Sequence, residues 1–179
     1  MLVYDSSGRP KISVSLSNSG GTMIVFLPGN NTPPSSNYAT LDHRGNHPVL
    51  DFDDSTDESA EFSGILPNQY GGGGVTVYLH YSMTSATSGN VDWDVSFERI
   101  GDQQLDIDSD SFATAKSVDD TTVPSTTGNV DVVSISFSDG SDMDSVAAGE
   151  LFRIRVTRDA SEDTASGDAE LHAVEIREQ

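Results

Sequence analysis

The sequence predicts an all-β fold: a two-layer antiparallel β-sandwich, jelly-roll-like, with a short N-terminal hairpin or arm. Apolar and polar residues alternate along many short segments, as in strands with one buried and one solvated face. Clusters of Gly, Pro, Asn and Ser separate about nine such segments, which is typical of a sandwich. Helical periodicity is almost absent. With 179 residues, the chain is long enough for a single domain with a sizeable core.

The first strands are expected in an uncharged stretch. Residues 12–41 carry no charge in a chain whose formal net charge is −20. Two short apolar strands, Ile12–Leu16 and Thr22–Leu27, are separated by Ser17-Asn-Ser-Gly-Gly21, which predicts a hairpin. The proline-rich segment 28–38 then suggests an extended linker.

We therefore expect two parts: an N-terminal attachment arm or hairpin plus linker over residues 1–37, and a jelly-roll-like sandwich over residues 38–179. The alternative is that the N-terminal part forms edge strands of the same sandwich. An uncharged hairpin with open edges favours pairing with another chain. The residues expected at that interface are Ile12, Val14, Leu16, Met23, Ile24, Val25, Phe26 and Leu27.

Three segments of the main body show the clearest alternation, with apolar residues at every second position. In one of them, Trp93 alternates with valines, which favours core packing over a sugar-stacking platform. Arg153, Arg155 and Arg158 lie in the third segment, and we expect them to pair with acidic residues. The segments are Val75–Met83, Val91–Ile100 and Leu151–Arg158; weaker strands are expected at Val49–Phe52, Ser59–Leu66, Val130–Phe137 and Glu170–Glu178.

The segments between the expected strands indicate how the strands are connected. Gly71–Gly74 precedes a strand, so we interpret it as a flexible hairpin turn rather than a phosphate loop. The long polar connection over 101–129 suggests an excursion between sheets. The one helical candidate is the single turn at 143–148.

Composition excludes several classes of function. With 9 basic and 29 acidic residues, the chain would repel phosphate backbones, so no nucleic-acid partner is expected. No apolar run is long enough to span a bilayer, so no membrane partner is expected. The chain contains no cysteine, and neither a nucleophile elbow nor an HExxH motif is present. We therefore expect no enzymatic activity and no catalytic residues.

One group of acidic residues has a spacing that favours metal binding. Asp106, Asp108 and Asp110 have the spacing of calcium-binding carboxylates, but an EF-hand would need Gly and Glu where Ser111 and Ser117 stand. A solvated acidic loop is the preferred interpretation, and a looser calcium site is the alternative. We likewise explain the acidic residues at 51–58 without an ion, although a cation would relieve the repulsion among their carboxylates. We also explain the pair His43 and His47 without an ion. No cofactor is expected.

Short pieces of sequence from residue 38 to the end form a wider pattern. They are Tyr38-Ala-Thr-Leu-Asp42 with Arg44, His47-Pro-Val-Leu-Asp-Phe52, Glu58, Phe62, Leu66-Pro67, Tyr70, Gly73-Gly-Val-Thr-Val-Tyr78, Trp93, Phe97-Glu-Arg99, Ala148-Gly-Glu-Leu-Phe-Arg153, Arg158-Asp159 and Asp168-Ala-Glu-Leu171. This pattern resembles a β-sandwich domain of tailed-bacteriophage virion proteins. It is similar to capsid decoration and head-fibre proteins, often trimers, and to domains of tail fibres.

The resemblance implies a non-enzymatic structural protein on the virion surface. Its implied role is capsid decoration, with the uncharged N-terminal segment bound to the major capsid protein or another virion protein. The implied oligomer is a homotrimer. The alternative is a receptor- or glycan-binding module of a tail fibre, which needs exposed aromatic side chains; the sequence offers Tyr78 and Tyr70.

Overall fold

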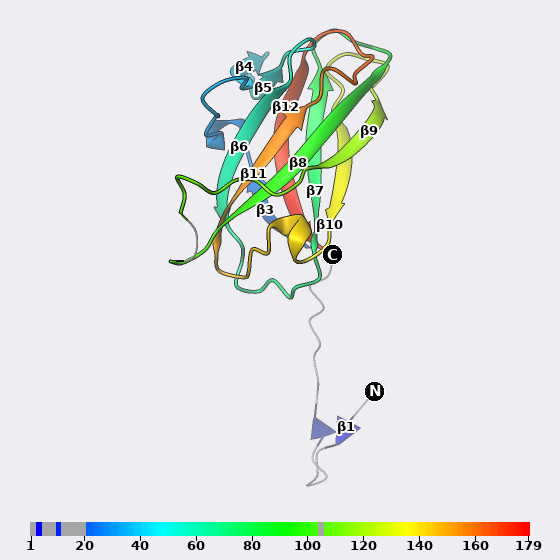
Figure 1. Ribbon diagram of the computed structural model, residues 1–179. Helices are drawn as coiled ribbons and strands as arrows, with labels where there is room; N and C mark the ends of the chain where they lie inside the picture. Colours follow the sequence, from blue (N-terminus) through cyan, green and yellow to red (C-terminus); the bar gives the residue numbers. More distant parts are fainter. Residues whose placement is uncertain (1–2, 5–9, 12–20, 104–105) are drawn as a thin grey trace.

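The computed structural model describes residues 3–4, 10–11, 21–103 and 106–179. Within residues 21–103 and 106–179, two antiparallel sheets pack face to face (Figure 1). One sheet has six strands. Five lie in the order β10 (Asp131–Phe137), β7 (Val75–Met83), β12 (Ala169–Glu178), β5 (His47–Phe52) and β4 (Thr40–Arg44), and β3 (Thr22–Phe26) also pairs with β12.

The second sheet has four strands, and successive strands of the chain repeatedly change sheet, which confirms the predicted jelly-roll-like sandwich. The two short strands β1 (Val3–Tyr4) and β2 (Pro10–Lys11) pair with each other. Two single-turn 3₁₀ helices complete the described elements, η1 (Pro28–Asn30) and η2 (Ser141–Met143). The four-stranded sheet has the order β6 (Glu58–Ile65), β11 (Leu151–Arg158), β8 (Asn90–Ile100) and β9 (Lys116–Thr122).

The core lies between the sheets and is built from the alternating apolar residues that the sequence indicates. Trp93 is fully buried, and the rings of Phe52 and Tyr81 meet it edge-on at centroid distances of 5.2 and 5.4 Å. This confirms the core assignment of the only tryptophan. Edge-to-face rings add about 0.5–1.5 kcal/mol per pair to the burial term.

The three arginines of β11 pair as expected. Arg153 binds Glu98 and Glu61, and Arg155 binds Glu61 with two nitrogen donors. These pairs lie on the outward face of the four-stranded sheet, where Phe112 of the connecting loop covers both guanidinium groups. The sequence pattern does not reveal this aromatic cover, because Phe112 lies in a loop without periodicity.

Residues 22–37 belong to the sandwich, which agrees with the alternative of edge strands and not with a separate arm and linker. Strand β3 pairs with β12 through Ile24 opposite Ile176 and Phe26 opposite Val174. The proline-rich segment then crosses to the other sheet. There it covers the edge of β6, since Thr32 and Ala39 donate backbone N–H groups to the carbonyls of Glu61 and Ser59. Residues 12–20 of the expected hairpin lie outside the described residues.

Four further details differ from the sequence-based expectation. Strands β4 and β9 were not expected, because both are polar edge strands without a clear apolar alternation. The glycines 71–74 join β6 to β7 in different sheets, so they are not a hairpin turn. The expected helical turn at 143–148 is replaced by η2, which begins earlier and ends where Asp144 and Ser145 adopt positive φ angles.

Among the described residues, no helix is long and apolar enough to cross a membrane.

Phe26→Ala should destabilise the fold by about 3 kcal/mol, since the ring stacks on Phe62 at 5.3 Å and meets Phe152 edge-on at 6.4 Å. Denaturant unfolding measures this loss. Val25→Ala is the control, because Val25 on the same strand is 49% exposed and should change stability by less than about 0.5 kcal/mol. Equal effects of the two substitutions would show that β3 is not part of the cooperative fold.

Candidate functional site

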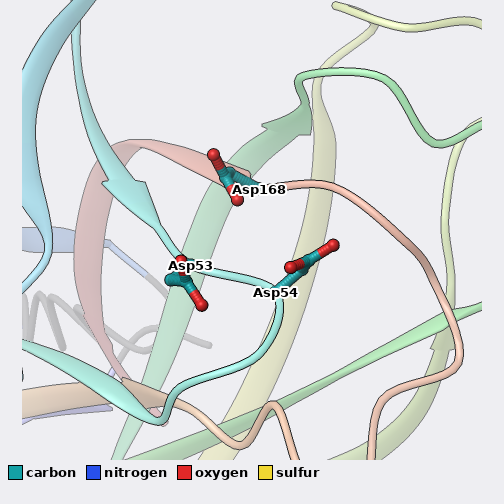
Figure 2. Close-up of side chains that lie close together, drawn as sticks. All are labelled: Asp53, Asp54 and Asp168. Atoms are coloured by element: carbon teal, nitrogen blue, oxygen red, sulfur yellow. The ribbon is translucent and has the colours of Figure 1, made fainter.

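Three carboxylates meet where β5 ends and β12 begins. Asp53 and Asp54 directly follow β5, and Asp168 directly precedes β12. Because Phe52 and Ala169 are partners in the antiparallel ladder, these ends lie side by side. Each of the three offers a carboxylate oxygen within 4.8 Å of the others (Figure 2). We call these three residues the acidic cluster.

Local hydrogen bonds orient the acidic cluster. The backbone N–H and hydroxyl of Ser55 donate to Asp53, and the N–H of Gly167 donates to Asp54. Burial raises the pKa of Asp168, and the negative charges of Asp53 and Asp54 raise it further. Clustered carboxylate oxygens are the donors that hard divalent cations such as Ca²⁺ prefer. The arrangement therefore fits a cation better than it fits a cofactor or a catalytic pair.

Asp51 and Glu58 extend the acidic cluster into a small recess of about 120 Å³, which Thr40 also lines. Burial raises the pKa of Asp51 to about 6, and Asp168 and Glu170 add to the shift by repulsion. The Oδ1 atom of Asp51 is buried and has no hydrogen-bond partner among the described residues. The recess therefore disfavours the charged form of this carboxyl at neutral pH.

Asp51→Asn should stabilise the protein at pH 7 by about 1 kcal/mol, an amount reduced for the partial exposure of the group. The sign follows from the pKa, which is higher in the folded state than its usual 3.8. The favourable contribution of Asp51 to the free energy of unfolding is fully present below pH 4, and it is lost as the pH rises through 6. Unfolding curves of both proteins at pH 4 and pH 7 measure the difference, which should vanish at pH 4. An advantage of the variant that is the same at both pH values would contradict this account.

The calcium candidates of the sequence lie elsewhere, in the loop between β8 and β9. Asp106 accepts a hydrogen bond from the N–H of Asp108, and Asp110 accepts one from the N–H of Ser111. The three carboxylates of Asp106, Asp108 and Asp110 are not among the groups of the described residues whose ligand atoms converge within 4.8 Å. They shape the turn locally, whereas strand pairing brings the acidic cluster together from residues more than a hundred positions apart.

Calcium at about millimolar concentration should raise the melting temperature more than sodium chloride of equal ionic strength, because a divalent cation offsets the repulsion in the acidic cluster. Asp168→Asn should remove this difference, and the control Asp108→Asn should retain it. Differential scanning calorimetry in chelator-treated buffer measures both. An equal response of the parent protein to calcium and to the matched salt would contradict the prediction.

A second recess, of about 390 Å³, is lined by residues of β4, β5 and β12 and of the loop before β10. It combines a guanidinium, two imidazoles and an apolar side chain. We call it the Arg–His pocket; its lining residues are Arg44, Gly45, His47, Gly128, Val130 and His172.

A hydrogen-bond network fixes the polar side of the Arg–His pocket. Arg44 binds the carboxylate of Glu170 and the carbonyl of Met83. The hydroxyl of Ser82 donates to Glu170 and is 2.9 Å from Nε2 of His172. Burial lowers the pKa of His172, so its imidazole is neutral at pH 7 and can both donate and accept a hydrogen bond.

The apolar side of the Arg–His pocket comes from the loop before β10. Val130 is 52% exposed there. Gly128 has φ +76° and lies so close to the guanidinium that an added Cβ would be 2.8 Å from Nε of Arg44. The positive φ favours glycine at this position, and its lack of a side chain lets the loop lie against Arg44. Sequence spacing pairs His47 with His43, whereas the structure brings His47 and His172 to the same pocket.

The aromatic side chains proposed for a binding surface are largely engaged. The guanidinium of Arg177 lies 4.2 Å from the ring centroid of Tyr78, and Glu175 holds that guanidinium with both oxygens. Arg177 and Thr22 lower the pKa of Glu175 to about 2, so this carboxylate is ionised. Tyr70 donates its hydroxyl to Asp139 and is only 9% exposed. A pocket that depends on polar groups therefore has better support than an aromatic platform.

The expected interface residues divide into three groups. Ile12, Val14 and Leu16 lie outside the described residues. Phe26 is buried in the core, and Met23 and Ile24 are partly buried against it. Val25 and Leu27 are 49% and 56% exposed.

The comparisons with known proteins find a shared fold. No protein-family model matches the chain, and no curated protein sequence matches it. A family 35 carbohydrate-binding module from an environmental isolate has a TM-score of 0.51 and 12% sequence identity, over 86% of this chain and 92% of the module. The family 35 module of Abf62 from Cellvibrio japonicus has a TM-score of 0.47 and 8% identity, over the same shares. The first similarity shows that this chain has the β-sandwich fold found in a carbohydrate-binding module.

Proposed function

We propose that this protein is a non-catalytic glycan-binding β-sandwich. Glycan binding is the alternative to capsid decoration that the sequence leaves open, and the fold shared with a carbohydrate-binding module makes it the preferred hypothesis. A glycan-binding module can also be carried on a virus particle, so the phage resemblance and this proposal are compatible.

The Arg–His pocket is the observation that supports the proposal most directly. Sugars present hydroxyl groups that donate and accept hydrogen bonds, next to apolar C–H surfaces. The pocket offers fixed donors and acceptors on one side and the exposed Val130 on the other. Its volume of about 390 Å³ lies within the range of small-ligand sites, roughly 300–1,000 Å³.

The charges of the Arg–His pocket favour an uncharged glycan. Arg44 is already paired with Glu170, and burial keeps His172 neutral, so neither of these two side chains offers an unpaired positive charge to an anion. The net charge of −20 repels acidic polysaccharides from the whole molecule. We therefore expect neutral oligosaccharides to bind better than uronic-acid oligomers.

Binding should be measurable by glycan array and by calorimetry with neutral oligosaccharides of glucose, xylose and mannose. His172→Ala should weaken binding at least about tenfold, since it removes a hydrogen-bonding group from the pocket wall. His43→Ala is the matched control, because His43 is exposed, lies next to Arg44 in sequence and does not line the pocket. A protein that binds no glycan on the array, or a His172→Ala variant with unchanged affinity, would refute the proposal.

A further inference from the structure

Strand β3 lies at an edge of the six-stranded sheet. It pairs with the second half of β12, while β5 pairs with the first half. Within the ranges that the structure describes, no strand pairs with the other side of β3. An open edge presents unpaired backbone N–H and C=O groups, which can template a further strand. The exposed Val25 and the adjoining Leu27 make this edge apolar.

The other sheet edges carry the features that usually prevent such pairing. Strand β4 contains Asp42 and Arg44, and β9 contains Lys116, Asp119 and Asp120. Strand β10 begins with Asp131. The edge of β6 is covered by the backbone of the segment that follows η1. Strand β3 alone among these edges has neither a charge nor a described cover.

The segment that follows β3 in sequence is also uncharged. The described residues from 21 to 41 contain no Asp, Glu, Lys or Arg. An apolar groove of about 250 Å³ begins at Pro28, one residue after Leu27, and is lined further by Pro33, Tyr38 and Leu41. Tyr38 and Leu41 are 47% and 55% exposed. The uncharged edge, defined here as β3 and residues 27–41, is therefore the apolar exception on a strongly acidic molecule.

We propose that the uncharged edge binds a second copy of this chain, with the two β3 strands pairing antiparallel across a two-fold axis. Charge selects this occupant. Two chains of net charge −20 repel each other over most orientations, but in an approach through the uncharged edges neither β3 nor residues 27–41 place a charged side chain in the contact, and the neighbouring Glu175 is already paired with Arg177. A basic partner, in contrast, would be drawn to the acidic surfaces elsewhere. The contact uses the same strand on both copies, so it is isologous and ends at a dimer.

Analytical ultracentrifugation of the full chain tests the proposal. The protein should form a dimer, and dimerisation should strengthen between about 0.05 and 0.5 M NaCl, because salt screens the repulsion between the acidic bodies. Val25→Asp should weaken dimerisation at least about tenfold, since it places two like charges in the contact and removes two apolar side chains from it. Val132→Asp is the matched control and should have no effect, because Val132 is 46% exposed on the edge strand β10.

Cross-linking provides a second readout that does not depend on a disruptive substitution. The chain has no cysteine, so Val25→Cys introduces a single thiol. A short bismaleimide should convert this variant to a covalent dimer and leave Val132→Cys monomeric. The proposal would be overturned by a full chain that stays monomeric at high salt, which includes the case in which its own residues occupy the edge. It would equally be overturned by a dimer that survives Val25→Asp.

Discussion

The buried guanidinium of Arg158 organises the end of the sandwich on which the acidic cluster depends. This side chain is fully buried and forms an ion pair with Asp163. It also donates to the carbonyls of Phe52, Ala165 and Gly167. One side chain thus ties the end of β5 to the loop that leads into β12. Removing such a group would leave a buried carboxylate and three carbonyls without their donor, a loss of about 3–5 kcal/mol.

The same guanidinium moderates the repulsion among the carboxylates above it. Arg158 lowers the pKa of Asp168 and of Glu58, in opposition to burial and to the neighbouring acids, which together keep both values raised. Each basic residue with a described side chain is likewise committed to an acidic partner, from Arg44 with Glu170 to Arg177 with Glu175. The surplus of acidic residues therefore remains without basic partners. This surplus makes most of the surface negative, and the uncharged edge therefore differs from the rest of the molecule.

The fold could be predicted from the sequence where burial is one-sided. The alternation around Trp93 fixes which residues face the core, because a slip of one residue would expose all of them. Strands β4 and β9 could not be predicted in this way, since an edge strand needs few apolar residues. For residues 22–37 the sequence left a separate arm and edge strands of the same sandwich equally open, for a related reason. Lack of charge indicates burial against something, but it does not distinguish a partner from the chain's own β12 and β6.

The candidate sites were harder to predict, because they depend on strand pairing. The spacing of Asp106, Asp108 and Asp110 is visible along the sequence, whereas Asp53 meets Asp168 only because β5 and β12 are neighbours. His47 and His172 meet at the Arg–His pocket for a similar reason, since their strands are neighbours in one sheet. Local spacing finds ligands that lie in one loop, and it misses those that a long-range register brings together.

The proposed dimer and the proposed glycan site have a geometric connection through β12. His172 lies in its first half, beside the Arg–His pocket, and β3 pairs with its second half. Pairing of two β3 strands would join the two six-stranded sheets into one, with a pocket on each side of the two-fold axis. A polysaccharide long enough to reach both pockets would then bind with an effective local concentration at the second site. Avidity of this kind strengthens weak single-site binding by about 10²–10⁴-fold without any new contact. Self-association would therefore increase glycan affinity only for long chains, and short oligosaccharides would bind the monomer and the dimer equally.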